Sequence, residues 1–428
     1  MGGKNWAGRV PDNWNLVRFS KAYSFSRGLD IKKQDLSDHG LPVISYGQIH
    51  AKDNPGVRVS DRHIRYIPEE FAKEAQLGRA LLEKGDIVFA DTSEDIEGVG
   101  NMMRAAGGST LYAGYHALIA RPSAEFRHKY MAYQMISSRW RQQIQRSVQG
   151  VKVYSITQRI FNEVTILQPP LHEQQLIVHY LDQKTAEIDA LIEKLSFQVE
   201  LLEKYRRELI ARTVTRGLNS DVPMRDSGIK WIGQTPVTWG LLRISSLYDL
   251  RSQKVSDKEH PPLSVTMNGV VPQLETVAKT NDGDNRKLVK AGDFVINSRS
   301  DRRGACGIAA QDGSCSLINT VLTPKHSINN RYFSYLFRSA LFADEFYRWG
   351  HGIHDDLWTT NWNDMKSIQV PVPPLEDQET IANYLDGKVT EIDSTVSGIR
   401  KQIELLGKYR KQVINDAVTG KVRVGEVA

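Results

Sequence analysis

Two long stretches of the chain carry apolar residues at steps of three, four or seven positions, which is the pattern of an amphipathic helix with one apolar stripe. Each stretch follows a Pro-Pro-Leu tripeptide and contains no further proline. Glutamate, lysine and arginine fill most of the other positions, so both stretches are predicted to be helical. The stripe positions are Ile188, Leu191, Leu195, Leu202, Tyr205 and Leu209 in the first stretch, and Ile392, Ile399, Leu406, Tyr409 and Val413 in the second.

The two stretches are copies of one another. Residues 169–215 align without a gap with residues 373–419, at a constant offset of 204. A weaker match joins the openings of the two halves, which share the pattern W-x-G-x-x-P-x-x-W from Trp6 and from Trp231. A Gly-Asp pair also recurs, at Gly85 and at Gly292. The chain is therefore an internal duplication in which the long helices repeat closely and the segments between them have diverged.

The helices are predicted to pair with each other. A helix over residues 172–216 would be about 67 Å long, and its apolar stripe needs a partner in water. Because each helix follows a globular segment, we expect an antiparallel coiled coil with the two globular segments at opposite ends. The alternative is that each helix docks on its own globular segment.

The two globular segments have mixed strand and helix signals. Residues 41–46, 85–90 and 111–120 read as strands in the first segment, and residues 126–149 read as a helix. The second segment repeats this with strands over 292–297 and 306–310 and a helix over 331–348. The predicted fold is of the α+β class, with two globular domains separated by two long helices in a pseudo-twofold repeat. The predicted boundaries are 1–165, 166–220, 221–367 and 368–428.

Composition and charge narrow the class of protein. The chain has 428 residues, of which 40% are hydrophobic and 25% charged, close to an ordinary globular composition. It has two cysteines and no apolar run long enough for a membrane span, so we expect no disulfide framework and a reducing cytoplasm. Lys and Arg exceed Asp and Glu by 23 to 17 in residues 1–165 and by 18 to 16 in 221–367, whereas both helices are slightly acidic. Any contact with nucleic acid is therefore expected on the globular domains.

Polar clusters in the globular domains supply candidate DNA contacts. Arginine presents a planar fork that suits phosphate and the guanine edge, and glutamine and asparagine can read adenine. The candidates are Gln48, Arg58, Arg62, His63, Arg65, Asn101 and Arg104 in the first domain, and Asn297, Arg299, Arg302 and Arg303 in the second.

Catalytic motifs are missing from the sequence. It has no G-x-x-x-x-G-K-[ST] phosphate loop, no Asn-Pro-Pro-Tyr or Asn-Pro-Pro-Phe motif, no G-x-S-x-G elbow and no H-E-x-x-H zinc site. His351 and His354 are three residues apart, but the adjacent Asp355 and Asp356 and the two distant cysteines make a poor set of metal ligands. No metal site is therefore predicted. We expect a protein without catalysis of its own.

The duplicated layout resembles the specificity subunits of type I restriction-modification systems. The paired P-P-L-x-E/D-Q openings of the helices and the repeated Y-L-D-x-K-x-x-E-I-D run carry the resemblance, which covers the whole chain. It implies that each globular domain is a target recognition domain that reads one half of a bipartite site in double-stranded DNA. It also implies that the helices space these halves and dock two modification (methyltransferase) subunits, which restriction (translocase and nuclease) subunits then join.

The same resemblance implies that S-adenosylmethionine, ATP and Mg²⁺ belong to the partner subunits and that this chain holds no cofactor. The setting it implies is the prokaryotic cytoplasm, in association with DNA and not with a membrane. Two alternatives stay open at this stage. One is a self-contained DNA methyltransferase or nuclease, and the other is a coiled-coil scaffold that does not bind DNA.

Overall fold

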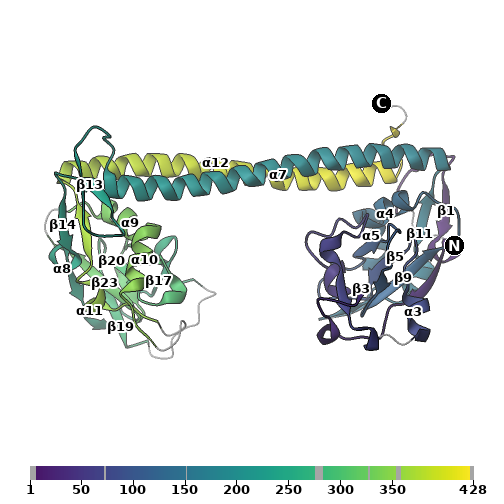
Figure 1. Cartoon of the computed structure of the whole chain (residues 1–428), viewed down its shortest axis with the longest axis horizontal. Coiled ribbons are helices and arrows are strands. Elements are labelled where there is room, and N and C mark those ends of the chain that lie inside the picture. The colour runs from purple at the N-terminus through teal and green to yellow at the C-terminus, as the bar shows by residue number, and fades with distance from the viewer. Residues whose placement is uncertain are drawn as a thin grey trace. The chain divides into compact units, whose positions relative to one another are not determined.

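The computed structural model describes residues 6–71, 74–150, 152–274, 283–325, 328–352 and 358–424. The chain forms two compact units, one of residues 1–194 with 402–428 and the other of residues 195–401. Each unit therefore combines one globular segment with part of both long helices, α7 (Leu171–Arg216) and α12 (Leu375–Val418) (Figure 1).

The first unit is built on a four-stranded antiparallel sheet in the order β2-β9-β5-β7. Smaller sheets are β4-β3-β8, β1-β11 and β6-β10. The strands are β1 (Asn15–Arg18), β2 (Tyr23–Arg27), β3 (Leu41–Ile44), β4 (Arg65–Ile67), β5 (Ile87–Ala90), β6 (Thr92–Ser93), β7 (Met102–Arg104), β8 (Tyr112–Ala113), β9 (Ala117–Pro122), β10 (Tyr154–Ser155) and β11 (Thr165–Gln168). The helices are α1 (Phe19–Ala22), α2 (Tyr46–Ile49), α3 (Glu74–Ala80), α4 (His128–Ile136), α5 (Ser138–Gln145) and α6 (Gln158–Glu163), with short 3-10 turns at Lys33–Asp35, Asp61–His63 and Glu69–Phe71.

The second unit repeats this design with a four-stranded sheet in the order β15-β23-β20-β21. Smaller sheets are β16-β19-β22, β12-β13, β14-β24 and β17-β18. The strands are β12 (Met224–Asp226), β13 (Gln234–Pro236), β14 (Gly240–Arg243), β15 (Tyr248–Arg251), β16 (Lys254–Val255), β17 (Leu263–Thr266), β18 (Gly269–Pro272), β19 (Arg286–Val289), β20 (Phe294–Asn297), β21 (Cys306–Ile308), β22 (Gly313–Cys315), β23 (Asn319–Pro324) and β24 (Gln369–Val372). The helices are α8 (Ile244–Leu247), α9 (Asn330–Arg338), α10 (Ala340–Arg348) and α11 (Trp362–Met365), with a 3-10 turn at Ser300–Arg302.

The central strand of each sheet is buried on both faces. In β5, Ile87 and Phe89 join the core beneath the helices, while Val88 and Ala90 join a second core on the opposite face. Successive side chains of a strand point to opposite faces, which explains this division. In β20 the residues Phe294 and Ile296 lie in one core and Val295 in the other.

The repeated Gly-Asp pair forms the turn that leads into each central strand. Asp86 accepts a hydrogen bond from the backbone N–H of Glu83 at 2.8 Å, and it forms an ion pair with Arg121, also at 2.8 Å. Asp293 does the same with the N–H of Lys290 at 2.8 Å and with Arg251 at 2.7 Å. Both carboxylates are buried, so the paired arginine offsets the cost of removing the charge from water.

The single helix predicted over 126–149 was wrong in one respect, because the chain forms two helices there. α4 ends before Ser137, whose extended backbone stops the helix and whose side chain accepts from the N–H of Trp140 to cap α5. The helix predicted over 331–348 is interrupted in the same way, by Ser339 between α9 and α10. The strand predicted over 111–120 is also divided, by a turn at residues 114–116 between β8 and β9.

Strand pairing refines where the globular segments end. β11 pairs with β1 in the register Asn15↔Gln168 to Arg18↔Thr165, and β24 pairs with β14 in the register Gly240↔Val372 to Arg243↔Gln369. Residues 165–168 and 369–372 are thus strands of the globular segments, and the helices begin just after them. The division of the chain into four domains stays a prediction.

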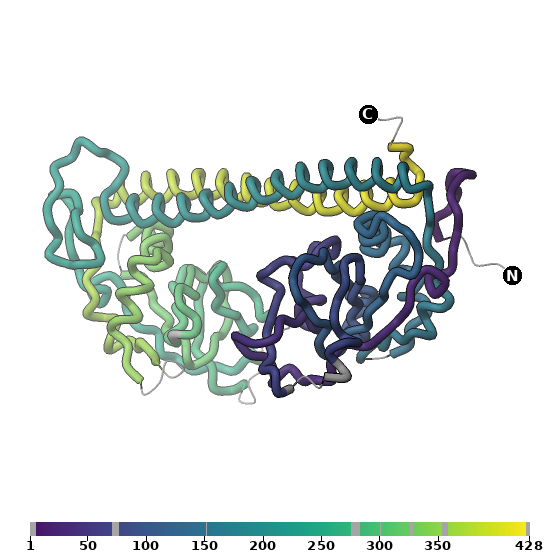
Figure 2. The backbone as a smooth tube through the Cα atoms, turned by 45° about the vertical axis from the view of Figure 1, so that its right-hand side comes forward, coloured from purple at the N-terminus to yellow at the C-terminus, as the bar shows by residue number. Residues whose placement is uncertain are grey.

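The long helices pair in an antiparallel direction within each unit. In the first unit, Asp189 of α7 forms an ion pair with Arg410 of α12 at 2.8 Å. In the second unit, Arg206 of α7 and Asp393 of α12 form the equivalent pair, at the same offset of 204. Figure 2 shows the two helices side by side in both units. The predicted coiled coil is therefore confirmed, and the alternative in which each helix lies only on its own globular segment is wrong.

The buried stripe differs in part from the predicted one. Ile188, Ile392, Ile399 and Val413 are buried, and Leu195, Leu202, Leu209 and Leu406 are half-buried. Leu191, however, is 44% exposed, and Tyr205 and Tyr409 are 51% and 52% exposed. Val199 and Val396, which were not predicted, are buried instead. Leu191 and the two tyrosines therefore fit the three- and four-residue steps of the stripe but remain largely exposed. No described helix is long and apolar enough to cross a membrane.

Candidate DNA interface and its attachment to the helices

The repeated glutamine at the start of each long helix joins the helix to its globular segment. Gln174 accepts a hydrogen bond from the N–H of Arg127 at 2.9 Å and donates to the carbonyl of Pro169 at 2.8 Å. Gln378 repeats both bonds with the N–H of Asn329 and the carbonyl of Pro373, at 2.9 and 2.7 Å. Both glutamine side chains are buried, so these backbone groups have no water to replace a lost bond.

The repeated aspartate two turns further on makes a second attachment. Asp182 accepts from the hydroxyl of Tyr133 at 2.7 Å and pairs with Lys129 at 2.6 Å. Asp386 accepts from the hydroxyl of Tyr335 at 2.7 Å and pairs with Arg331, also at 2.7 Å. Burial and the neighbouring carboxylate raise the pKa of both tyrosines, so each hydroxyl keeps its proton and donates.

The other long helix is also held by each globular segment. The buried hydroxyl of Tyr332 donates to the carbonyl of Val214, close to the end of α7, at 2.8 Å. Its counterpart Tyr130 lies 3.5 Å from the carbonyl of Val418, at the end of α12. Each globular segment is therefore attached to the start of one long helix and the end of the other.

We expect Tyr133→Phe and Tyr335→Phe to lower the free energy of unfolding by about 1 kcal/mol each, because each removes a hydrogen bond to a partly exposed carboxylate. Tyr133→Phe also removes a longer contact, of 3.3 Å, with the Thr185 hydroxyl. Chemical denaturation of the full chain measures this. Tyr154→Phe is the matched control. Within the described part of the first unit the Tyr154 hydroxyl makes no hydrogen bond, so its loss should leave stability unchanged. If Tyr133→Phe and Tyr335→Phe are both as stable as Tyr154→Phe, the hydrogen bonds to Asp182 and Asp386 do not stabilise the attachment of the globular segments to the helices.

The two globular segments present equivalent loops at the end of the central strand. In the first, the N–H of Asp91 donates to the carbonyl of His116 at 3.1 Å. In the second, the N–H of Ser298 donates to the carbonyl of Ile318 at 3.4 Å. Loop 91–101 after β5, which includes the short strand β6, and loop 298–305 after β20 thus leave equivalent edges of the two four-stranded sheets. We call loop 91–101, with the residues that contact it, the first reading edge, and loop 298–305, with the residues that contact it, the second reading edge.

The charges of the reading edges are opposite. Loop 91–101 carries the acidic residues Asp91, Glu94, Asp95 and Glu97 and no basic residue. Loop 298–305 carries Arg299, Arg302 and Arg303 and a single acidic residue, Asp301. One scaffold therefore supports two surfaces that would favour different ligand groups at the same position.

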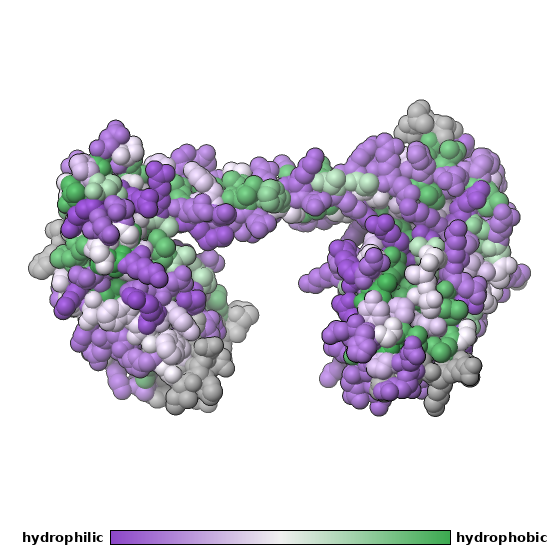
Figure 3. Space-filling view, in the orientation of Figure 1, coloured by the Kyte–Doolittle hydropathy of each residue, from purple (hydrophilic) through white to green (hydrophobic). Residues whose placement is uncertain are grey.

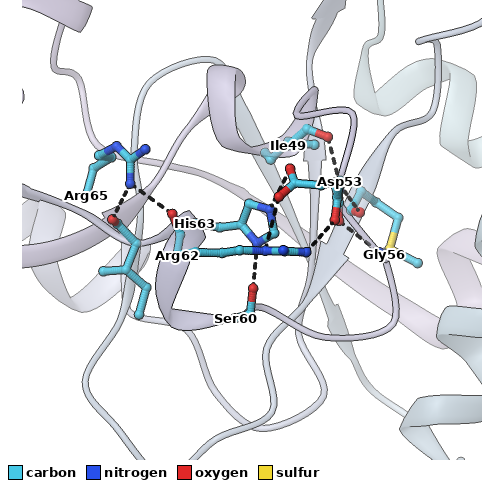
Figure 4. A network of polar contacts seen from close by, with 10 residues as sticks. Ile49, Asp53, Gly56, Ser60, Arg62, His63 and Arg65 are labelled. Carbon is cyan, nitrogen blue, oxygen red and sulfur yellow. Dashed lines mark hydrogen bonds and ion pairs between the residues drawn. The ribbon is translucent and has the colours of Figure 1, made fainter. Parts of the chain in front are cut away.

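Several first-domain candidates form one network (Figure 4). Buried His63 lies between the Ser60 hydroxyl at 2.8 Å and the Asp53 carboxylate at 3.2 Å. Arg62 forms an ion pair with the same carboxylate at 3.1 Å, with 62% of its side chain exposed. The hydrogen bond from His63 lowers the pKa of Asp53. His63 is thus placed to position the loop, and Arg62 to reach outward.

The remaining first-domain candidates separate into engaged and exposed side chains. Gln48 caps α2 by accepting from the N–H of Ser45, and the Asn101 amide lies 3.1 Å from a ring nitrogen of His50. Arg104 is half-buried and donates to the carbonyl of Val57, and burial lowers its pKa. Arg58 and Arg65 are exposed, although Arg65 also donates to two backbone carbonyls.

The second-domain candidates gather at the basic reading edge. The Asn297 side chain accepts from the N–H of Arg299 at 3.0 Å and so shapes the start of the loop. Arg303 lies over the ring of Tyr347 at 4.4 Å and pairs with Asp344 at 2.9 Å. Arg302 has 65% of its side chain exposed. A small pocket here is lined by Asn297, Arg299 and Arg303 together with Phe337, Tyr347 and Trp358.

Sequence reasoning missed an aromatic and imidazole cluster at the first reading edge. Tyr46, His50, Tyr115 and His116 lie within ring-to-ring distances of 4.5 to 6.2 Å. Residues 111–120 alternate like one strand, which hid the turn that brings Tyr115 and His116 to the edge. Gly114, in the middle of that run, was the available signal, since glycine in a strand pattern often marks a break.

The chain is thus a modular protein, in which a duplicated α+β unit carries two unlike polar edges and is attached twice to a helical pair. Comparison with known proteins gives the family. Residues 26–201 and 236–405 match the family described as the type I restriction modification DNA specificity domain. The chain belongs to this family, as the sequence resemblance predicted.

Named relatives and solved structures agree with this assignment. The type I restriction enzyme StySPI specificity subunit of Salmonella potsdam is 21% identical, over 97% of this chain and 90% of its own length. The MjaVIII specificity subunit of Methanocaldococcus jannaschii is 23% identical, over 66% of this chain and 67% of its own length.

Among solved structures, a chain from a study of assembly and conformational transition of the type I R-M system covers 97% of this chain and 100% of its own length, with a TM-score of 0.67 and 16% identity. The HsdS subunit from Thermoanaerobacter tengcongensis covers 97% of this chain and 98% of its own length, with a TM-score of 0.54 and 17% identity. These two likenesses concern the fold.

Proposed function

We propose that this DNA specificity subunit reads a bipartite, asymmetric site in double-stranded DNA, one half with each globular unit. The observation that carries this proposal is the combination of an identical attachment with unlike reading edges. Gln174, Asp182 and their copies hold both units in the same way, whereas the loops at the reading edges differ in charge and length. Two equal readers would have needed no such divergence.

The helical pair would set the gap between the two half-sites. α7 has 46 residues and α12 has 44, and each runs through both units. A continuous helix is a stiff spacer, because every residue adds a fixed rise of about 1.5 Å.

The exposed apolar residues of the helices support docking of two copies of one partner. Leu201 and Tyr205 on α7 are 49% and 51% exposed, and their copies Leu405 and Tyr409 on α12 are 54% and 52% exposed. Figure 3 shows hydrophobic residues at the surface of the helices. Each pair is four residues apart and so lies on one helix face. Because the duplication presents this face once in each unit, we propose two modification (methyltransferase) subunits as the partners.

Catalysis would then belong to the partner subunits. Methyl transfer needs S-adenosylmethionine, and translocation with cleavage needs ATP and Mg²⁺, so these groups are assigned to the modification and restriction subunits. This chain would select the site and hold the catalytic subunits beside it. Methylation or cleavage of DNA by the isolated chain would favour the self-contained enzyme instead.

Neutralising Arg299, Arg302 and Arg303 together to Gln should weaken DNA binding and reduce its dependence on salt. Each lost phosphate contact lowers the slope of log K against log salt by about 0.9, so the three together lower it by up to about 2.7. Titration of a labelled duplex at several salt concentrations measures both quantities.

The matched control neutralises three exposed cations of the helices, Arg207, Arg212 and Lys401, which should leave DNA binding unchanged. If both triple variants keep the salt slope of the parent chain, the second reading edge does not contact DNA. Absence of salt-dependent binding by the parent chain itself would favour a scaffold that does not bind DNA.

A further inference from the structure

His116 has a strained backbone at the first reading edge. It is the one non-glycine residue with positive φ, at 50°, among the residues that the structure describes. Side chains other than glycine rarely take this conformation because the Cβ atom approaches the carbonyl oxygen. Such strain persists where the surroundings impose it, and it concentrates at functional positions.

The imidazole of His116 is held firmly yet faces solvent. Its Nδ1 atom lies 3.0 Å from Oδ1 of Asp91, and the N–H of Asp91 donates to the carbonyl of His116 at 3.1 Å. The carboxylate accepts a hydrogen bond from Nδ1–H, which leaves Nε2 as the second ring nitrogen. The side chain is 58% exposed, so this second nitrogen has room for a ligand.

Two tyrosines complete the surface around this ring. Tyr46 contacts it edge-on with ring centroids 6.2 Å apart, and Tyr115 does so at 6.0 Å. Both tyrosines are half-buried, and burial raises the pKa of each, with Glu94 and Asp95 adding to the effect at Tyr46. Their hydroxyls therefore remain protonated and able to donate hydrogen bonds.

The acidic surroundings decide which part of DNA this surface suits. Asp91, Glu94, Asp95 and Glu97 would repel phosphate, in contrast to the arginines at the second reading edge. Carboxylate oxygens accept hydrogen bonds, which suits the amino groups of cytosine and adenine in the major groove. The segment with Arg58 and Arg62 lies close by and would supply phosphate contacts. Asn54, which precedes it, donates to the carbonyl of Met102 in β7, and His50 lies 3.0 Å from the carbonyl of Thr92 at the reading edge.

We propose that His116 contacts a base of the first half-site and determines its specificity, with Tyr46 and Tyr115 beside it. Asp91 is the positioning residue, because it acts through the imidazole. The inference rests on the proposed reading of DNA by both units, and it gives the two units different recognition chemistry at equivalent edges.

The decisive variant is His116→Gly in the full-length chain. Glycine accepts the positive φ without strain, so the melting temperature should stay equal or rise while the ring is lost. Selection from a duplex pool randomised at both half-sites should then show about tenfold weaker discrimination at one or two positions of the first half-site. The second half-site should be unchanged. His39→Gly, at an exposed histidine of the same unit, is the matched control and should leave the selected bases of both half-sites unchanged.

A second variant tests the positioning role. Asp91→Asn keeps a side chain of the same size but presents an amide to the imidazole, so it should relax the same base positions as His116→Gly. Unchanged selection by His116→Gly, or equal loss at both half-sites, would overturn the inference. If the parent chain itself enriches no bipartite motif, the proposed function fails and the inference fails with it, so the two failures are distinguished by the parent chain.

Discussion

Replacement of residues 1–168 by the corresponding segment of another family member is expected to exchange the first half-site and to preserve the second. The graft carries its own reading edge and its own copies of Tyr130, which contacts the end of α12, and of Tyr133, which donates to Asp182. The endpoint at 168 matters because β11 pairs with β1, and a junction at 165 would divide that pair. Selection from a randomised duplex pool reports both half-sites at once.

The matched exchange replaces residues 221–372 and ends after β24, which pairs with β14. It should change the second half-site and preserve the first. A graft that changes both half-sites, or neither, contradicts independent reading by the two units.

Removal of one heptad from both helices together should shorten the gap between the half-sites by up to about three base pairs. The segments to delete are 195–201 and 398–404, which face each other in the register of the pairs Asp189–Arg410 and Arg206–Asp393. Seven residues correspond to about 10 Å of helix, against about 3.4 Å per base pair. A heptad returns the buried stripe to nearly the same face, so the packing survives. Selection from pools with spacers of different length measures the gap.

The control deletes 195–201 alone. Each globular segment is attached to the start of one long helix and to the end of the other. Shortening α7 alone therefore moves the attachment site at the end of α7 out of register with the site at the start of α12. This variant should lose stability and selective binding, whereas the paired deletion keeps both half-sites. A paired deletion that leaves the gap unaltered would show that the helices do not set it.

The helical pair and the duplication could be predicted because they depend on patterns within one sequence. An ungapped repeat with three- and four-residue steps specifies two alike helices, and their stripes need partners. The exposed positions Leu191, Tyr205 and Tyr409 could not be separated from buried ones, since apolar character alone does not tell which partner covers a residue. The exposure of Tyr205 and Tyr409 follows from the pairing geometry that the structure supplies.

The reading edges were predictable only in part. Arg299, Arg302 and Arg303 are close in sequence, so their loop stood out. Tyr46, Asp91 and His116 come from three separate segments, and only the sheet brings them together. Among the candidates, Gln48 and Arg104 are engaged with the protein itself, which residue type does not reveal. Their roles in DNA binding stay predictions.

Mapping of the methylated bases in the genome of the source cell tests the central proposal most directly. Two unlike readers on one stiff spacer predict a single asymmetric motif with two defined parts, separated by a fixed number of undefined bases. A continuous motif, a palindrome or a gap of variable length would contradict the account.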